Sequence, residues 1–161
     1  MHTLRIQPVD FEDPACTDDF LNLLDHYMRS PSGTGKPMPA ELRTRLPTEL
    51  RKRPTVLSFV AYQDGRAAGL INCVEGFSTF AGKPLLNIHD IIVHEDFRRQ
   101  GIARALLTHA EQAALALGCC KLTLEVLEGN GGAREAYTGF GFQAYQLDPA
   151  MGQALFMEKK L

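Results

Sequence analysis

The sequence predicts an α+β fold in which a central mixed sheet of six to seven strands is flanked by about four helices. Several short segments alternate between apolar and polar residues, as strands do, whereas others repeat apolar residues at helical spacing. Turn sequences such as Asp64-Gly65 join consecutive strand-like segments and indicate antiparallel hairpins. A strand, a long helix and another strand then follow one another, which indicates a parallel pair joined by a right-handed crossover.

Two helices are expected between the first two strands. Residues 4–8 alternate in polarity and predict a short strand, and residues 14–29 place apolar side chains at helical spacing. Residues 39–51 predict a second helix, although Pro47 argues against its running unbroken, because proline removes a helical hydrogen bond. Residues 30–39 hold three prolines and two glycines and predict a long loop between these helices.

The later elements follow from turn residues and periodicity. Strands are predicted over residues 55–63, 67–77 and 85–93, separated by turns that contain glycine. Residues 101–117 form an amphipathic pattern that ends at a glycine, which predicts a long helix. The remaining strand, short helix and two closing strands are expected at residues 121–127, 133–137, 142–147 and 154–160. The predicted order is therefore β-α-α-β-β-β-α-β-α-β-β.

Composition narrows the class of protein. The 161 residues suit a single domain over residues 1–161, and the net charge of −2 gives no global attraction to nucleic acid or an anionic membrane. No apolar run approaches the ~20 residues that span a bilayer, and residues 1–10 lack the apolar core of a signal peptide, so a cytoplasmic location is expected. The four cysteines lack the paired spacing of a zinc site, which predicts reduced thiols and no metal.

A short polar loop between the fourth strand and the long helix is the first candidate site. The first turn of a helix has free N–H groups and the positive end of its dipole, which together favour an anion. Gly101 and Ala103 leave room for the anion to approach the backbone, while Arg98, Arg99 and Arg104 add positive charge. From these residues alone, a phosphate site and an ordinary solvated basic helix start are equally good interpretations.

A resemblance to a known family decides between them. The run Arg98-x-x-Gly101-x-Ala103 resembles the Q/R-x-x-G-x-G/A signature of the Gcn5-related N-acetyltransferase (GNAT) superfamily. The strand end Ile91-Ile92-Val93 precedes that run. About 30 residues further on, Asn130-x-x-Ala133-x-x-x-Tyr137-x-x-x-Gly141-Phe142 is similar to the family's second characteristic run. The similarity covers roughly residues 55–160 and implies the family's three-layer fold.

The resemblance implies an acetyl-CoA site and assigns roles by position. It implies that backbone amides around Gly101 bind the CoA pyrophosphate, that the strand before them binds the pantetheine arm, and that Tyr137 protonates the departing thiolate. The cofactor-binding residues implied are Ile91, Ile92, Val93, Arg98, Arg99, Gln100, Gly101, Ile102, Ala103, Arg104, Asn130, Ala133 and Tyr137. The sequence departs from the family pattern at Glu95, where proline is common, and at Gly131-Gly132, which weakens a helix start.

Three residues compete as the base that deprotonates the acceptor. Glu125 lies in the expected strand 121–127, where a carboxylate among apolar residues is costly to bury, and its surroundings resemble those of a glutamate in ribosomal-protein N-acetyltransferases. His89 and Asp90 occupy a run that resembles one in diamine N-acetyltransferases, with His89 in place of a glutamate. Each could also be structural, and Glu125 is favoured over His89.

These observations predict an acetyl-CoA-dependent N-acetyltransferase. A primary amine would attack the thioester directly in a ternary complex, and a small, polyamine-like acceptor is favoured because Glu75, Asp90, Glu125 and Glu128 are expected to make the pocket acidic. The loop over residues 30–39 is expected to form part of the pocket wall. The alternatives are a non-catalytic acyl-CoA-binding module and an enzyme that acetylates protein amino termini or lysines. A homodimer is the expected assembly.

Overall fold

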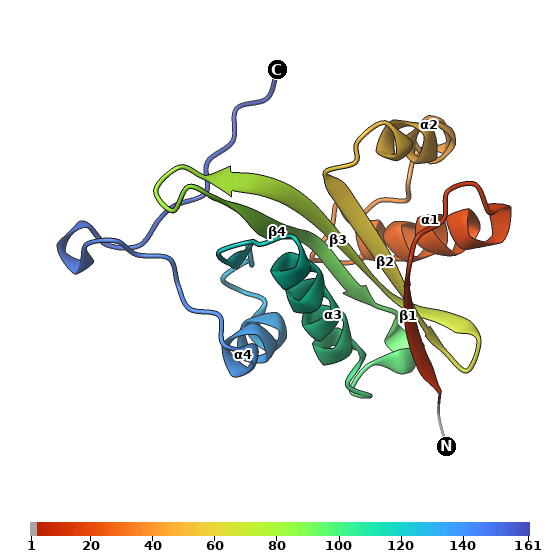
Figure 1. The fold of residues 1–161 in the computed structure, drawn as a ribbon. Helices are drawn as coiled ribbons and strands as arrows, with labels where there is room; N and C mark the ends of the chain where they lie inside the picture. The colour runs from red at the N-terminus through yellow and green to blue at the C-terminus, as the bar shows by residue number, and fades with distance from the viewer. Residues whose placement is uncertain (1–2) are drawn as a thin grey trace. The chain divides into compact units, whose positions relative to one another are not determined.

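Five strands form one mixed sheet in the part of the chain that ends at Leu124 (Figure 1). The computed structural model describes residues 3–161, and Glu125–Leu161 form a second compact unit that is described by itself. The strands, in their order across the sheet, are β1 (Leu4–Pro8), β2 (Val56–Gln63), β3 (Arg66–Ser78), β4 (Lys83–Val93) and β5 (Leu122–Leu124). The helices of this unit are α1 (Pro14–Arg29), α2 (Ala40–Arg51) and α3 (Ile102–Ala116), with a 3-10 turn, η1 (Glu95–Phe97).

The strand pairing confirms the predicted mixed sheet. The first four strands pair antiparallel in sequence order, whereas β4 and β5 are parallel, with Leu86 opposite Leu122. Asp64 and Gly65 turn β2 into β3 with φ angles of 51° and 80°, which is the left-handed backbone that a two-residue hairpin requires. The parallel pair is joined through α3, as a strand–helix–strand unit requires.

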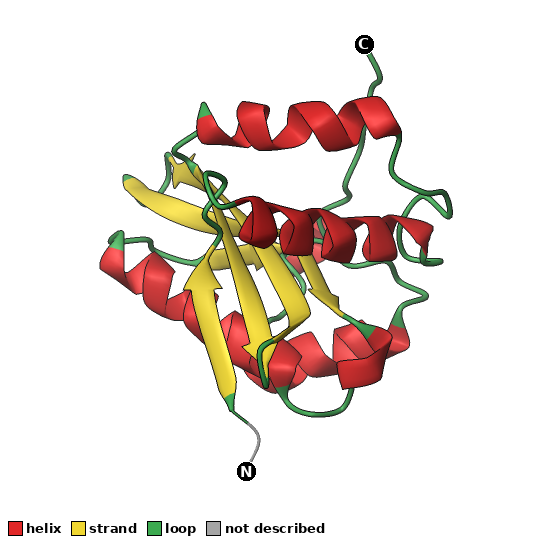
Figure 2. Cartoon of the chain, turned by 90° about the vertical axis from the view of Figure 1, so that its right-hand side faces the viewer, coloured by secondary structure: helices red, strands yellow, loops and turns green. Residues whose placement is uncertain are grey.

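Helices cover both faces of the sheet in this unit (Figure 2). A buried cluster joins α1 to Val60, Tyr62, Leu70 and Ile92, and apolar residues of α2 pack against the same cluster. On the opposite face, α3 approaches β3 at Gly69, where an added Cβ would lie 2.9 Å from the Ile92 carbonyl oxygen and 3.1 Å from side-chain atoms of α3. A larger residue at this position would push the helix away from the sheet.

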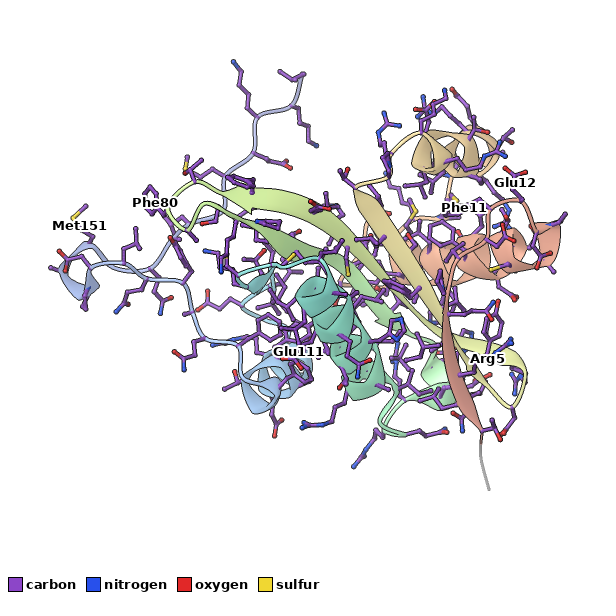
Figure 3. All side chains as sticks on the ribbon, in the orientation of Figure 1. Arg5, Phe11, Glu12, Phe80, Glu111 and Met151 are labelled. Carbon is purple, nitrogen blue, oxygen red and sulfur yellow. The ribbon has the colours of Figure 1, made fainter. Side chains whose placement is uncertain are left out.

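Local sequence features explain where α1 begins, and α2 continues through an internal proline. Asp13 caps α1, because its carboxylate accepts a hydrogen bond of 3.0 Å from the Ala15 amide, and Pro14 occupies the first turn. In α2, Pro47 lies inside the helix without ending it, so the expected break is absent. Figure 3 shows Phe11 between α1 and α2, and its ring meets that of Phe20 edge-on at 5.1 Å.

The second unit contains α4 (Gly131–Phe140) and a 3-10 turn, η2 (Pro149–Met151). The predicted closing strands at residues 142–147 and 154–160 are wrong, because neither segment is a strand in the described structure, and the sheet therefore has five strands rather than six to seven. One backbone hydrogen bond, from the Ala154 amide to the Tyr145 carbonyl, joins them at 3.1 Å. Alternation of apolar and polar residues indicates which side chains would lie on each face of a strand. A segment becomes a strand only when its backbone pairs with a neighbouring strand.

Candidate active site

The loop between β4 and α3 has a backbone shaped by two left-handed residues. Arg99 has a φ of 61° and Gly101 a φ of 80°, a conformation that is uncommon for a residue with a side chain such as Arg99. The Gln100 side-chain amide donates to the Asp96 carbonyl at 3.3 Å, and the Arg98 guanidinium donates to the Val93 carbonyl at 3.5 Å. These bonds hold the loop against the end of β4.

The start of α3 offers uncompensated backbone donors. Gly101 occupies the N-cap position, and among residues 3–161 no side chain caps this helix and no acidic residue lies in its first turn. Arg98, Arg99 and Arg104 are exposed around it. An added Cβ at Gly101 would meet no atom within 4 Å. A cavity of about 490 Å³ is lined by β1 and α3, and its α3 residues run from Gly101 to Gln112. The arrangement suits an anionic group such as a pyrophosphate.

The edge of β4 is left outside the ladder just before this loop. Pairing between β4 and β5 ends where Ile88 lies opposite Leu124, whereas β4 continues to Val93. Ile91 and Val93 are half-buried and Ile92 is buried in the core. Backbone groups of β4 beyond Ile88 are therefore outside the ladder with β5, where the sequence predicts the pantetheine arm.

His89 and Asp90 lie at an irregularity in β4. The register between β3 and β4 shifts between the pairs Asn72–Asp90 and Cys73–Ile88, so that His89 is the extra residue and its side chain is exposed. Asp90 is half-buried, and its Oδ2 accepts a hydrogen bond of 2.9 Å from the Asn72 side-chain amide. Of these two neighbours, Asp90 is the one whose side chain is hydrogen-bonded to the adjacent strand.

Asp90 also influences two neighbouring groups. Burial raises the pKa of Tyr27, and the negative charge of Asp90 raises it further. Burial likewise raises the pKa of the Cys73 thiol to about 12, with a second contribution from Asp90. Tyr27 belongs to α1 and Cys73 to β3, so the carboxylate lies near both layers.

The second unit holds the other predicted site residues. Asn130 caps α4, because its side chain accepts a hydrogen bond of 3.2 Å from the Ala133 amide, and the helix begins at Gly131 despite two glycines. Tyr137 is half-buried in α4, and its ring lies edge-on to that of Phe142 at 6.1 Å. Phe142 folds back because its amide donates to the Tyr137 carbonyl at 3.0 Å.

Two carboxylates do not lie where the sequence placed them. Glu125 was expected inside a strand, but β5 ends at Leu124 and Glu125 is exposed just beyond it. Glu75 was expected in one pocket with Asp90, but strand alternation puts Glu75 on the face of the sheet opposite to that of Asn72, the partner of Asp90. Burial raises the pKa of Cys119, and the negative charge of Glu75 raises it further. Within the unit that ends at Leu124, Glu75 and Asp90 therefore lie on opposite faces of the sheet.

Sequence reasoning missed three polar residues near Asp90. Ser58 and Asn72 are buried, and Tyr27 is half-buried. The signal was present in part, because Ser58 and Asn72 each interrupt an otherwise apolar strand. A polar residue in such a run has to find a partner, but its sequence does not name that partner.

A stacked histidine pair was also missed. The rings of His26 on α1 and His94 after β4 lie 4.3 Å apart with an interplanar angle of 27°. The His94 Nδ1 accepts a hydrogen bond of 3.3 Å from the Asp96 amide, which fixes this ring at the start of η1. The stack thereby links α1 to the loop that precedes α3.

We expect this pair to make stability pH-dependent. Burial lowers the pKa of His26, the positive charges of His94 and Arg98 lower it further, and Glu95 and Asp25 oppose the shift. The folded state disfavours protonated His26. The contribution of His26 to the free energy of unfolding is therefore complete above the ordinary histidine pKa of about 6.5, and it is lost as the pH falls below that value. The free energy of unfolding, measured by urea denaturation from neutral to mildly acidic pH, should decline less in His26→Phe. An unchanged decline would contradict this role.

Residues 3–161 contain neither a cluster of metal ligands nor a helix that could span a membrane. Within residues 3–161, no three His, Cys, Asp or Glu side chains gather as ligands for a metal ion. None of the helices described there combines the length and the apolar character needed to cross a bilayer. All four cysteines are free, and Cys16 and Cys73 are buried.

A mixed sheet with an arginine-flanked, uncapped helix start after β4 defines the class of CoA-binding acyltransferases that the sequence predicts. The sequence profile of the acetyltransferase (GNAT) family matches residues 20–142. This match covers more than half of the chain, and the chain therefore belongs to the GNAT family. Family membership and the predicted fold class are confirmed, apart from the strand count.

Relatives and solved structures agree with this assignment. N-alpha-acetyltransferase MAK3 of Arabidopsis thaliana is 36% identical over 88 residues, 53% of this chain and 44% of the relative. Streptothricin acetyltransferase of Streptomyces lavendulae is 37% identical over 102 residues, 63% of this chain and 52% of the relative. These matches span about half the length of the curated relatives. A solved structure of AAC(6')-Iy with a CoA-containing bisubstrate analogue shares the fold, with a TM-score of 0.77, 16% identity and 99% of both chains covered.

Proposed function

We propose that this protein is an acetyl-CoA-dependent N-acetyltransferase that acetylates a primary amine of a small molecule by direct attack in a ternary complex. The observation that carries the proposal is the uncapped start of α3, with Gly101 and its arginines, directly after a β4 edge that is outside the ladder with β5. Family membership supports the same activity. A CoA site on this fold is also supported by the neighbour whose solved structure holds a CoA-containing bisubstrate analogue.

Acetyl-CoA would supply the activated acyl group as a thioester. Its pyrophosphate would accept hydrogen bonds from the backbone amides of residues 99–104, while Arg98, Arg99 and Arg104 neutralise its charge. The backbone of Ile91 and Val93 would hold the pantetheine arm along β4. A strand amide near Ile92 or Val93 would donate to the oxyanion that forms when the amine attacks. Most of the rate would come from holding both reactants in place.

The proton steps complete the proposal. An alkyl ammonium, with an ordinary pKa near ~10, must lose a proton before it can attack. We assign this step to Glu125 in preference to His89, and the protonation of the leaving thiolate to Tyr137. Asn130 and Ala133, at the start of α4, are the remaining residues that the family's second run assigns to CoA.

The proposal is tested by release of free CoA thiol from acetyl-CoA in the presence of an amine panel. We expect a diamine to be consumed faster than an amino acid, because Asp90 attracts an ammonium and repels a carboxylate. Faster turnover of amino-terminal peptides would replace the small-molecule part of the proposal. Acetyl-CoA binding without transfer to any amine would favour a non-catalytic CoA-binding module, and absence of CoA binding would overturn the proposal altogether.

The choice of base has its own test. The acidic limb of the pH dependence of kcat/KM reports protonation of the base. The variant that lacks the base should therefore lose this limb. We expect this loss in Glu125→Gln and a retained limb in His89→Ala. The reverse pattern would assign the step to His89.

A cytoplasmic location and a homodimer are also part of this proposal, and both rest on the sequence and family. Cell fractionation tests the first. Light scattering of the purified protein tests the second, with a mass of twice the 17.8 kDa chain expected.

A further inference from the structure

A chain of polar side chains crosses the centre of the sheet. Ser58, Asn72 and Asp90 lie on the adjacent strands β2, β3 and β4. The Ser58 hydroxyl donates to the Asn72 Oδ1 at 2.7 Å, and the Asn72 Nδ2 donates to the Asp90 Oδ2 at 2.9 Å. Ser58 and Asn72 are each only 8% exposed, so both side chains depend on these partners.

All three side chains lie on the face that α1 covers. Ser58 is two residues from Val60, Asn72 is two from Leu70 and Asp90 is two from Ile92, and these apolar residues belong to the cluster packed against α1. Side chains two apart along a strand share a face. These three polar side chains therefore extend from the core beneath α1 towards the part of β4 beyond Ile88, which is not paired with β5.

The bonds fix the direction of each group. Asn72 presents its carbonyl oxygen to Ser58 and its amide nitrogen to Asp90, so both ends of the amide are used. An amide that was free to turn over would point an oxygen at the carboxylate and repel it. A carboxylate oxygen accepts, so Asp90 determines that the amide nitrogen of Asn72 faces it, and the Ser58 hydroxyl, which can donate or accept, satisfies the Asn72 Oδ1 at the other end. The bond from Asn72 engages Asp90 Oδ2, and the other carboxylate oxygen, Oδ1, takes no part in that bond.

The end of this chain lies where an acceptor amine is needed. Asp90 stands at the register shift in β4, just past the last pair with β5 and just before Ile91. This is the stretch of β4 beside which the proposed thioester would lie. Asp90 also acts electrostatically on Tyr27 of α1, the helix that leads into the loop over residues 30–39, which is expected to form part of the pocket wall.

We infer that Asn72, anchored by its bond to Ser58, is a positioning residue that holds Asp90 so that its second carboxylate oxygen receives the ammonium group of the acceptor. This inference rests on the proposed function and deepens it, because it gives the acceptor a cationic amine and a fixed point of attachment. Asn72 touches neither reactant and acts through Asp90. Its loss should therefore change amine recognition more than acetyl-CoA binding.

The test uses steady-state kinetics of the full chain with the best amine of the panel. Ser58→Ala removes the bond that anchors the Asn72 Oδ1, and Asn72→Leu removes the contact with Asp90. We expect the amine KM to rise ~10-fold or more in Asn72→Leu, the loss expected when a half-buried charged group loses its hydrogen bond. The rise should be smaller in Ser58→Ala, and the acetyl-CoA dissociation constant should stay within about twofold in both, because neither contacts CoA.

Asn72→Asp provides a readout that a purely structural role would not move. It keeps the size and polarity of the side chain but places a second carboxylate beside Asp90, which disfavours ionisation of the pair. The pH below which the amine KM rises should therefore move upward. This variant also keeps the inference testable where Asn72→Leu does not fold.

Tyr62→Phe is the matched control. The Tyr62 hydroxyl donates to the Asp19 carboxylate at 2.9 Å on the same face of β2, but neither residue contacts Asp90. This variant should lower the melting temperature and leave the amine KM and its pH dependence unchanged. If folded Asn72→Asp and Ser58→Ala both keep the wild-type amine KM and pH profile, the inference is overturned. If the wild-type protein acetylates no amine, the proposed function fails first, and the inference fails with it.

Discussion

Gly101→Glu is expected to weaken acetyl-CoA binding by ~100-fold or more, equivalent to about 2.8 kcal/mol. The new carboxylate would lie at the uncapped start of α3, in space where an added Cβ meets no other atom, and would repel the pyrophosphate from the backbone donors. The substitution also forces a side chain onto a φ of 80°, which costs roughly 1–2 kcal/mol of stability. Isothermal titration calorimetry with acetyl-CoA measures the loss directly.

Gly118→Glu separates the charge effect from the backbone effect. Gly118 has a φ of 73°, is exposed, and follows the other end of α3, and an added Cβ there would also meet no atom within 4 Å. Both variants force the same side chain onto a left-handed backbone and add the same charge. The helix dipole should make Gly118→Glu the less stable of the two, but only Gly101→Glu should lose CoA. Equal affinities in the two folded variants would show that the pyrophosphate does not bind at this helix start.

Tyr137→Phe is expected to lower kcat by ~10- to 1,000-fold while leaving acetyl-CoA affinity unchanged. Phenylalanine keeps the ring that lies edge-on to Phe142, so the packing at the end of α4 should survive. What is lost is the hydroxyl that we propose protonates the thiolate of CoA. Rapid mixing with saturating acetyl-CoA and the best amine of the panel measures this step.

Tyr145→Phe is the control for this substitution. It removes the same hydroxyl from an exposed tyrosine of the same unit, outside the residues that the family resemblance assigns to the site. We expect its kcat to match that of the wild-type protein. A native kcat in Tyr137→Phe would instead make this tyrosine a packing residue of α4.

Local signals in the sequence determined most of the elements. Asp13-Pro14 marks the start of α1, and the bounds predicted for β1 and α1 are those observed. The turn at Asp64-Gly65 and the end of the helix at Gly118 could also be predicted from the sequence, because few residue types other than glycine adopt a left-handed backbone readily. The candidate phosphate loop was predicted from small residues, arginines and a helix start within one short segment, and the family resemblance favoured it over a solvated basic helix start.

The tertiary structure alone decided features that depend on partners distant in the sequence. Residues 142–147 and 154–160 have strand-like alternation but no ladder, and β5 stops at Leu124, which leaves Glu125 beyond its end. Asn72 was only a polar residue in an apolar strand until the register placed it opposite Asp90. Composition and spacing reveal which groups need a partner, whereas strand register and packing select that partner, because these contacts join residues far apart in the chain.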